Sequence, residues 1–257
     1  MEQEYEACLE SIQQVVEEEL QQYTRAMYLF GSYLREKQRD ESGWIIPGTS
    51  DLDILFIVDT GDPRPEKPLR RLSKISQILS PFFMEPVYAP ILDLTILDYS
   101  ELPPSRCSIF SPIHLESAAK GTLLLGRDVL RAFDFSKRLL HRAARARILD
   151  VYQSLRDAYL RRSANIFDLT FISLDGVLDV AHAILYLQGD PDLVRIEVPE
   201  RFTKMSDDDR FGPDLSLVPQ QAWDLRLGIQ KKLTHAAFCE RALQFCRTAW
   251  HFVRSPL

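Results

Sequence analysis

Three aspartates carry the chemistry that this sequence can support. Asp51 and Asp53 stand two residues apart at the start of an apolar run, 52–58. Because side chains alternate between the two faces of a strand, both carboxylates point the same way, about 6.6 Å apart at Cα. Burying two like charges in this way is unfavourable unless a cation lies between them. The pair is therefore suited to hold one or two divalent cations.

A third acid interrupts another short apolar strand. Asp93 lies within the run 91–97. If this strand pairs beside 52–58, Asp93 joins Asp51 and Asp53 around the same metal pair, an arrangement that clamps the attacking and leaving oxygens of a phosphoryl or nucleotidyl displacement. Asp98, one residue out of phase with Asp93, is expected to be an ordinary loop acid.

The motifs around these acids resemble those of the nucleotidyltransferase superfamily that includes DNA polymerase beta. The shared pattern is Gly31-Ser32 after a short apolar run, a spacer, Ser-Asp-x-Asp at 50–53, and the lone acid Asp93 in a later strand. The resemblance covers roughly residues 24–130. Chain length and a helical second half are more similar to the kanamycin and streptomycin adenylyltransferase branch and to the minimal nucleotidyltransferases. The spacer 33–50 is long and charged, and we interpret it as a lengthened loop over the active site.

The resemblance implies a role for each residue of the motif. Asp51 and Asp53 would hold magnesium against a triphosphate, in a two-metal site. Asp93 would either complete the second metal site or act as the general base, and the sequence leaves both roles open. Gly31 and Ser32 would bind the triphosphate, because a residue without Cβ lets a backbone N–H approach phosphate and the serine hydroxyl adds a hydrogen bond.

The implied reaction is transfer of a nucleoside monophosphate, AMP from ATP being the expected case, to an acceptor hydroxyl with release of pyrophosphate. By analogy the acceptor is an aminoglycoside-like small molecule that binds between two domains. The alternative is a minimal-nucleotidyltransferase antitoxin that binds and modifies a partner toxin protein. A homodimer is compatible with either function.

Composition excludes several other classes of protein. The 257 residues are 46% hydrophobic and 26% charged, as in ordinary globular proteins. A net charge of −6 argues against a dedicated nucleic-acid binder, although a local basic stripe can sit on an acidic protein. The chain has no Walker loop, no G-x-S-x-G and no H-E-x-x-H, which disfavours P-loop ATPases, serine hydrolases and zinc enzymes. With an acidic N-terminus and no long apolar run, a cytoplasmic protein without a membrane partner is expected, and its four cysteines should be reduced.

The pattern of apolar residues predicts an α+β fold in two domains. Residues 1–134 should form a nucleotidyltransferase domain with a small mixed sheet packed on helices, and residues 135–257 a helical bundle. In the first domain we expect helices over 4–23 and 69–79, the second stopped by Pro81, and strands over 27–30, 53–58 and 91–97. In the second domain we expect four helices, over 137–162, 166–188, 218–232 and 234–253.

Overall fold

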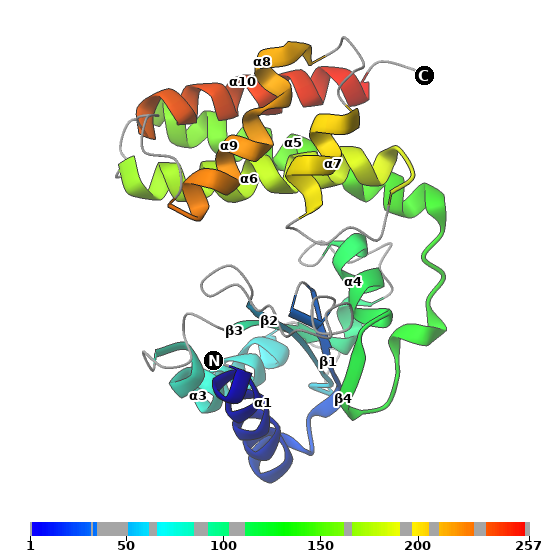
Figure 1. Ribbon diagram of the computed structural model, residues 1–257. Coiled ribbons are helices and arrows are strands. Elements are labelled where there is room, and N and C mark those ends of the chain that lie inside the picture. Colours follow the sequence, from blue (N-terminus) through cyan, green and yellow to red (C-terminus); the bar gives the residue numbers. More distant parts are fainter. Residues whose placement is uncertain are drawn as a thin grey trace. The chain divides into compact units, whose positions relative to one another are not determined.

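The protein has an α+β fold, with a four-stranded mixed sheet and helices (Figure 1). It divides into two compact units, Met1–Leu139 and Leu140–Leu257; the sequence places the boundary after residue 134. The computed structural model describes residues 2–31, 33–34, 51–61, 66–84, 92–102, 111–161, 166–190, 197–205, 211–228 and 235–254. Among the helices of this part of the chain, none combines the length and the apolar character needed to cross a bilayer.

The sheet of the first unit has the strand order β3-β2-β1-β4. β1 (Thr24–Phe30) is antiparallel to both β2 (Leu52–Val58) and β4 (Thr122–Gly126), whereas β3 (Leu92–Asp98) runs parallel to β2. The three strands predicted from sequence are confirmed, with ends that differ by a few residues. β4 was not predicted as a strand.

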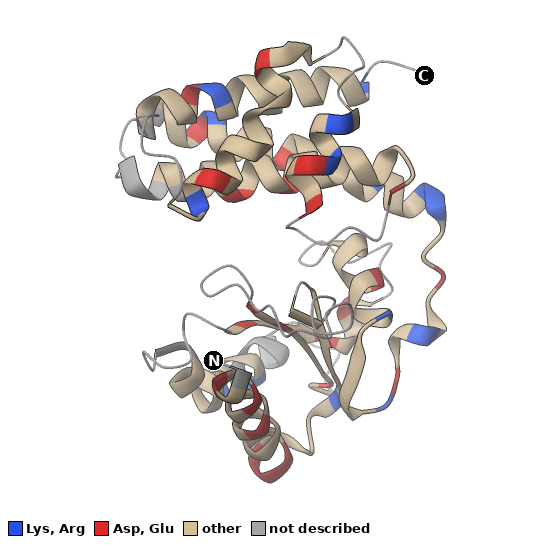
Figure 2. Cartoon of the chain, viewed as in Figure 1, with Lys and Arg blue, Asp and Glu red and all other residues tan. Residues whose placement is uncertain are grey.

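The N-terminal helix changes its winding before it reaches the sheet. α1 (Glu2–Val15) continues into a wider π-helical turn, η1 (Val16–Leu20). The buried residues Ile12, Val16 and Leu20 are four apart, a spacing that drifts around an α-helix of 3.6 residues per turn. A wider turn keeps Leu20 on the buried face, and the intervening glutamates give the exposed side of this segment its acidic colour in Figure 2.

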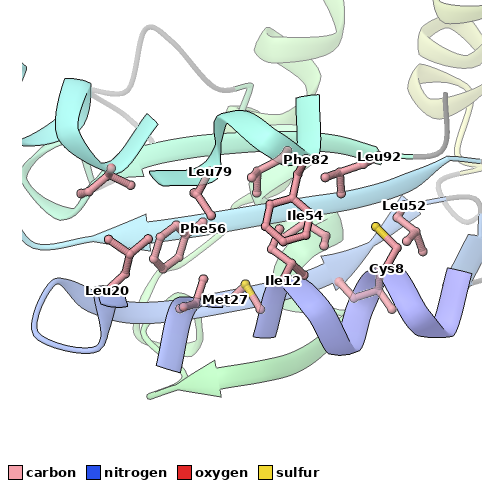
Figure 3. Packing of buried hydrophobic residues seen from close by; sticks show 14 of the residues in the cluster. Cys8, Ile12, Leu20, Met27, Leu52, Ile54, Phe56, Leu79, Phe82 and Leu92 are labelled. Carbon is pink, nitrogen blue, oxygen red and sulfur yellow. The ribbon is translucent and has the colours of Figure 1, made fainter. Parts of the chain in front are cut away.

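One face of the sheet packs against α1 and α3 (Glu66–Met84) in a continuous apolar core (Figure 3). Alternate residues of the strands supply the sheet's side of this core, among them Met27, Ile54 and Phe56, while Ile12 and Leu79 come from the helices. Cys8 is also part of it, and burial raises the pKa of its thiol to about 11. Cys8, Cys239 and Cys246 are buried free thiols, as expected, and Cys107 lies outside the described residues.

Helix α3 is longer than the sequence suggested. We expected Pro81 to end it, but the helix continues through Pro81 to Met84. Proline has no N–H to donate to the carbonyl four residues earlier, which is that of Gln77. The Ser80 hydroxyl donates a hydrogen bond of 2.8 Å to this same carbonyl oxygen. The lost backbone partner is thus replaced by a neighbouring side chain. At its other end α3 begins at Glu66, three residues before the expected start at residue 69.

The other face of the sheet is covered by α4 (Pro112–Ala119) and the short helix η3 (Leu130–Ala132). Tyr28 of β1 ties η3 to the sheet, because its hydroxyl accepts a hydrogen bond from the Leu130 N–H and donates one to the Asp128 carboxylate, both 3.1 Å long. Burial in this position raises the pKa of Tyr28 to about 12. The alternate residues Leu55 of β2 and Leu97 of β3 complete this second core.

In the described part of the second unit all regular elements are helices, and the first of them begins three residues before the unit boundary. Four of its helices agree with the prediction, although the third is shorter: α5 (Lys137–Arg161), α6 (Ile166–Leu187), α9 (Val218–Arg226) and α10 (His235–Arg254). Two short helices, α7 (Val198–Met205) and α8 (Gly212–Ser216), were not predicted. The apolar helix α6 packs against α7, α9 and α10, and two of its aspartates, Asp175 and Asp179, form ion pairs with Arg226 of α9 and Arg147 of α5.

Candidate metal centre

The three aspartates singled out from the sequence meet at one end of the sheet. β2 and β3 are neighbours, and in their parallel register Asp53 stands level with Asp93. Asp51 lies one residue before β2. The side-by-side pairing that a shared site requires is therefore present. Both strands begin at this end of the sheet, and β1 ends here, since its last residue Phe30 pairs with Asp53.

The carboxylates converge more closely than their backbone spacing suggests. One carboxylate oxygen from each of Asp51, Asp53 and Asp93 lies within 4.8 Å of the other two. The strand alternation places these residues on the sheet face that carries Leu55, Ile57 and Leu97, the face covered by α4. Asp51 and Asp53 are half-buried and Asp93 is exposed. The cluster is thus accessible from solvent on one side and backed by the sheet on the other.

Gly31 gives the Asp53 carboxylate the space that it occupies. It follows β1 with φ +80°, and a Cβ at this position would lie 1.7 Å from Asp53 Oδ2. Any other residue would both strain the backbone and push the carboxylate away. We predicted Gly31 as a triphosphate-binding residue; the described contact is with the metal-ligand candidate itself. Ser32, predicted as its partner in phosphate binding, lies outside the described residues.

The segment after Gly31 is anchored to the N-terminal helix. The Tyr33 ring is buried and stacks on Tyr5 of α1, with the ring centroids 5.0 Å apart and the rings parallel. This contact orients the chain as it leaves β1. The loop predicted to cover the active site, 33–50, lies outside the described residues from position 35 onward.

The electrostatics of the cluster favour a cation. Asp93 is exposed as a residue, yet surrounding protein atoms partly desolvate its carboxyl group; this desolvation, and then the negative charge of Asp51, raises the pKa of Asp93. Neither Asp51 nor Asp93 forms an ion pair with a residue in the described part of the chain. A bound cation would relieve the repulsion between them.

The donor set fits a hard divalent cation. Carboxylate oxygens are the ligands that Mg²⁺ prefers, at about 2.1 Å, so two oxygens on opposite sides of one ion are about 4.2 Å apart. The three carboxylate oxygens lie within 4.8 Å of one another, so the cluster is close to the size that one ion requires. Gly31 contributes to this donor set, because the absence of a Cβ leaves room for the Asp53 carboxylate in the cluster.

Asp98 is a structural acid, contrary to the sequence-based expectation of a plain loop residue. It is 4% exposed and ends β3. Its carboxylate accepts hydrogen bonds from the Thr60 N–H at 3.2 Å and the Ser100 N–H at 2.9 Å, and it caps the short helix η2 (Tyr99–Glu101). Burial by itself would raise the pKa of Asp98, but the hydrogen bonds from Ser100 and Thr60 lower it overall. The sequence contains a signal for this capping role, since Asp98 and Glu101 are three residues apart, the spacing of a capping box.

A polar cleft of about 450 Å³ lies at the opposite end of β1 and β2. Its lining includes Arg25, Asp59 and Arg71. Arg25 Nε donates a hydrogen bond of 2.7 Å to Asp59 Oδ2. At this end of the sheet, the charge of an aspartate is therefore neutralised by an arginine of the same chain. Because the three clustered aspartates are at the other end, this cleft is separate from the metal-site candidate.

Comparison with known proteins adds one distant likeness. No protein-family model matches the chain, and no curated protein matches it. Among solved structures, a nucleotidyltransferase-like protein from Exiguobacterium sibiricum 255-15 is similar over 94% of this chain and 75% of its own, at 14% identity and a TM-score of 0.35. At that TM-score the likeness is too remote to assign a function, which has to be argued from the carboxylate cluster.

Proposed function

We propose that the protein is a magnesium-dependent nucleotidyltransferase, which moves a nucleoside monophosphate from a nucleoside triphosphate, AMP from ATP in the expected case, to an acceptor hydroxyl. One observation carries the proposal: three carboxylates, two from the adjacent strands β2 and β3 and one from the residue just before β2, converge within 4.8 Å at the end of a sheet. The motif resemblance of Gly31-Ser32 and Ser-Asp-x-Asp agrees with it.

The proposal gives each acid a task. Asp51 and Asp53 would hold the metal, and Gly31 would maintain the Asp53 carboxylate in position by leaving its space free. Asp93, exposed at the edge of the cluster, would be the acid nearest to an incoming acceptor and could serve as second-metal ligand or general base. When bound, magnesium would neutralise the triphosphate and stabilise the charge that develops on the α-phosphate oxygens.

Other chemistry fits the cluster less well. Three carboxylates with no histidine or cysteine among them are a poor zinc site. A purely structural role would not explain why Asp51 and Asp93 form no ion pair or hydrogen bond with a described residue, whereas the buried Asp98 accepts hydrogen bonds from two backbone N–H groups. A metal site that binds phosphate groups explains why all three ligands are carboxylates and why Asp51 and Asp93 form no ion pair with a described residue.

The test is product analysis after incubation with ATP and magnesium. Candidate acceptors, aminoglycosides in one arm and proteins in another, are examined by mass spectrometry for the addition of one AMP, and pyrophosphate release is measured in parallel. Modified protein in place of a modified small molecule would identify the antitoxin-like alternative. Asp93→Asn should suppress transfer, whereas Asp134→Asn, the same change at an exposed position outside the cluster, should not. Equal activity in both variants would refute the proposed site.

A further inference from the structure

Helix α5 has an arginine stripe on the face that points away from the core of its unit. We use this name for Arg138, Arg142, Arg145 and Arg156, which are all exposed. The buried residues of α5 are Leu140, Ala144, Ile148, Val151 and Leu155. At about 100° per residue the four arginines fall within a sector of roughly 60°, well separated from the buried side of the helix. The Cα atoms of the stripe extend over about 27 Å.

The stripe has little negative charge near it. From Lys137 to Arg147 the helix carries five cations and no acid, although the whole chain has a net charge of −6. The two acids of α5, Asp150 and Asp157, come later and lie about 60° or more around the helix from the nearer edge of the stripe. Arg147 is paired with Asp179, but none of the four stripe arginines forms an ion pair with a described residue.

This distribution is unfavourable for the isolated helix. The beginning of a helix carries partial positive charge, which favours acids in the first turn and disfavours cations. α5 begins with Lys137 and Arg138 and has no acid in its first turn, so its first turn is blue in Figure 2. Arg138 and Arg142 also repel each other as like charges four residues apart. A bound polyanion would remove both penalties at once.

We propose that the arginine stripe binds the phosphate backbone of a nucleic acid. Arginine suits this partner because its planar guanidinium donates two parallel hydrogen bonds to phosphate oxygens, and arginines along one face of a helix can contact several phosphates of one strand. An anionic membrane fits less well, because a helix that lies on a bilayer inserts an apolar face, and the apolar face of α5 is buried within its own unit. The proposal does not depend on the carboxylate cluster or on catalysis.

The expected signature is strong salt dependence without sequence preference. Four phosphate contacts to a single strand give a slope of about −2.8 for log affinity against log salt, so a rise from 50 to 200 mM salt should weaken binding about 50-fold. With three of the contacts removed, the same rise should weaken binding only about threefold.

The experiment measures fluorescence anisotropy of a labelled single-stranded 20-nucleotide RNA of mixed sequence with the full chain. The test variant is Arg138→Gln, Arg142→Gln and Arg145→Gln combined. The matched control removes the same charge elsewhere, by Arg201→Gln, Arg247→Gln and Arg254→Gln, which are exposed arginines of α7 and α10. We expect the wild type and the control to keep the steep slope and the stripe variant to lose it.

A thermal melting curve of each variant tests whether the variant is folded. Because it removes cations from the beginning of α5, the stripe variant should melt at or above the wild-type temperature. Three results would overturn the proposal: no RNA binding by the wild type at 50 mM salt, an equal loss in the stripe and control variants, or stripe-dependent binding to phosphatidylserine vesicles without binding to RNA. Since no nucleotide substrate is present, the result does not depend on the proposed transferase activity.

Discussion

Both units of the protein contain aspartates in or beside apolar elements, but two in helix α6 form ion pairs with described residues whereas Asp51 and Asp93 do not. In the helical unit, Asp175 and Asp179 of α6 each face an arginine from a neighbouring helix. In the sheet unit, Asp51 and Asp93 come within 4.8 Å of each other with no such ion pair in the described part of the chain. The first arrangement holds helices together, whereas the second leaves a repulsion between carboxylates that a bound cation or protonation would relieve. The contrast separates structural acids from site acids without reference to any relative.

The glycines of the two units show the same division. In α6, a Cβ on Gly176 would lie 2.8 Å from Val151 Cγ1, so this glycine lets α5 and α6 pack closely. In the sheet unit, a Cβ on Gly31 would overlap the Asp53 carboxylate instead. One glycine makes room for an apolar side chain of the core and the other for a half-buried charged group. A position reserved for a charge is expected at a binding site, not in packing.

The largest difference between the two kinds of acid should appear in activity. Asp53→Asn keeps the shape of the side chain beside Gly31 but removes its charge, and we expect nucleotidyl transfer to fall at least about a hundredfold, equivalent to roughly 2.7 kcal/mol. Asp175→Asn should leave the transfer rate unchanged and lower stability instead, because Arg226 loses its partner. Steady-state rates and chemical denaturation of both variants give the comparison. Near-normal transfer by Asp53→Asn would show that the cluster is not catalytic.

Ligand binding should stabilise the protein only when metal and nucleotide are present together. A bare triphosphate is repelled by three carboxylates, and a cation between them removes the repulsion. With both ligands in hundredfold excess over their coupled dissociation constant, mass action adds about 2.7 kcal/mol, or roughly 5–11 °C in Tm for a chain of this size. Thermal melts with magnesium, a non-hydrolysable ATP analogue, both or neither measure the coupling. An undiminished shift in Asp51→Asn, or an equal shift with nucleotide alone, would contradict a metal-triphosphate site.

Strand β3 allows the comparison to be made within one element, because Asp98 is a structural acid and Asp93 is a candidate site acid. The lowered pKa of Asp98 means that its charge stabilises the fold at neutral pH, and that this contribution is lost as pH falls through about 3.9 and below. We expect Asp98→Asn to cost about 1–2 kcal/mol at pH 7, since the capped N–H groups lose a charged acceptor. The difference from wild type, measured by urea unfolding, should shrink as the pH is lowered; a pH-independent difference would mean that packing and not charge is lost.

The sequence predicted the elements that are dense in apolar residues and the acids that interrupt them. β2 and β3 could be found because their runs are long and their acids stand out, whereas β4 was missed because Leu123–Leu125 is a short apolar run between glycines with no clear period. The prediction that Pro81 ends α3 was wrong, because the hydrogen bond from the Ser80 hydroxyl to the Gln77 carbonyl depends on side-chain geometry. The close approach of Gly31 to Asp53 joins residues far apart in the chain, so the sequence alone did not predict it.

The smallest expected effect concerns Asp93, and it has the opposite sign to that of Asp98. Desolvation and the charge of Asp51 raise the pKa of Asp93, so its ionised form weakens the metal-free fold. Its contribution to stability is present at low pH and is lost as pH rises through the raised pKa. Asp93→Asn should therefore stabilise the protein at neutral pH in EDTA, by less than about 0.5 kcal/mol because the residue is exposed and solvent screens the charges.

Urea unfolding of wild type and Asp93→Asn across pH 3 to 8 measures this gain, which should disappear as the pH is lowered and both proteins become neutral at position 93. Excess magnesium and the ATP analogue should reverse its sign at neutral pH, because the variant loses a metal ligand and binds the pair more weakly. If Asp93→Asn were destabilising in EDTA, as Asp98→Asn is expected to be, Asp93 would belong with the structural acids. The distinction between the two ends of this strand would then fail.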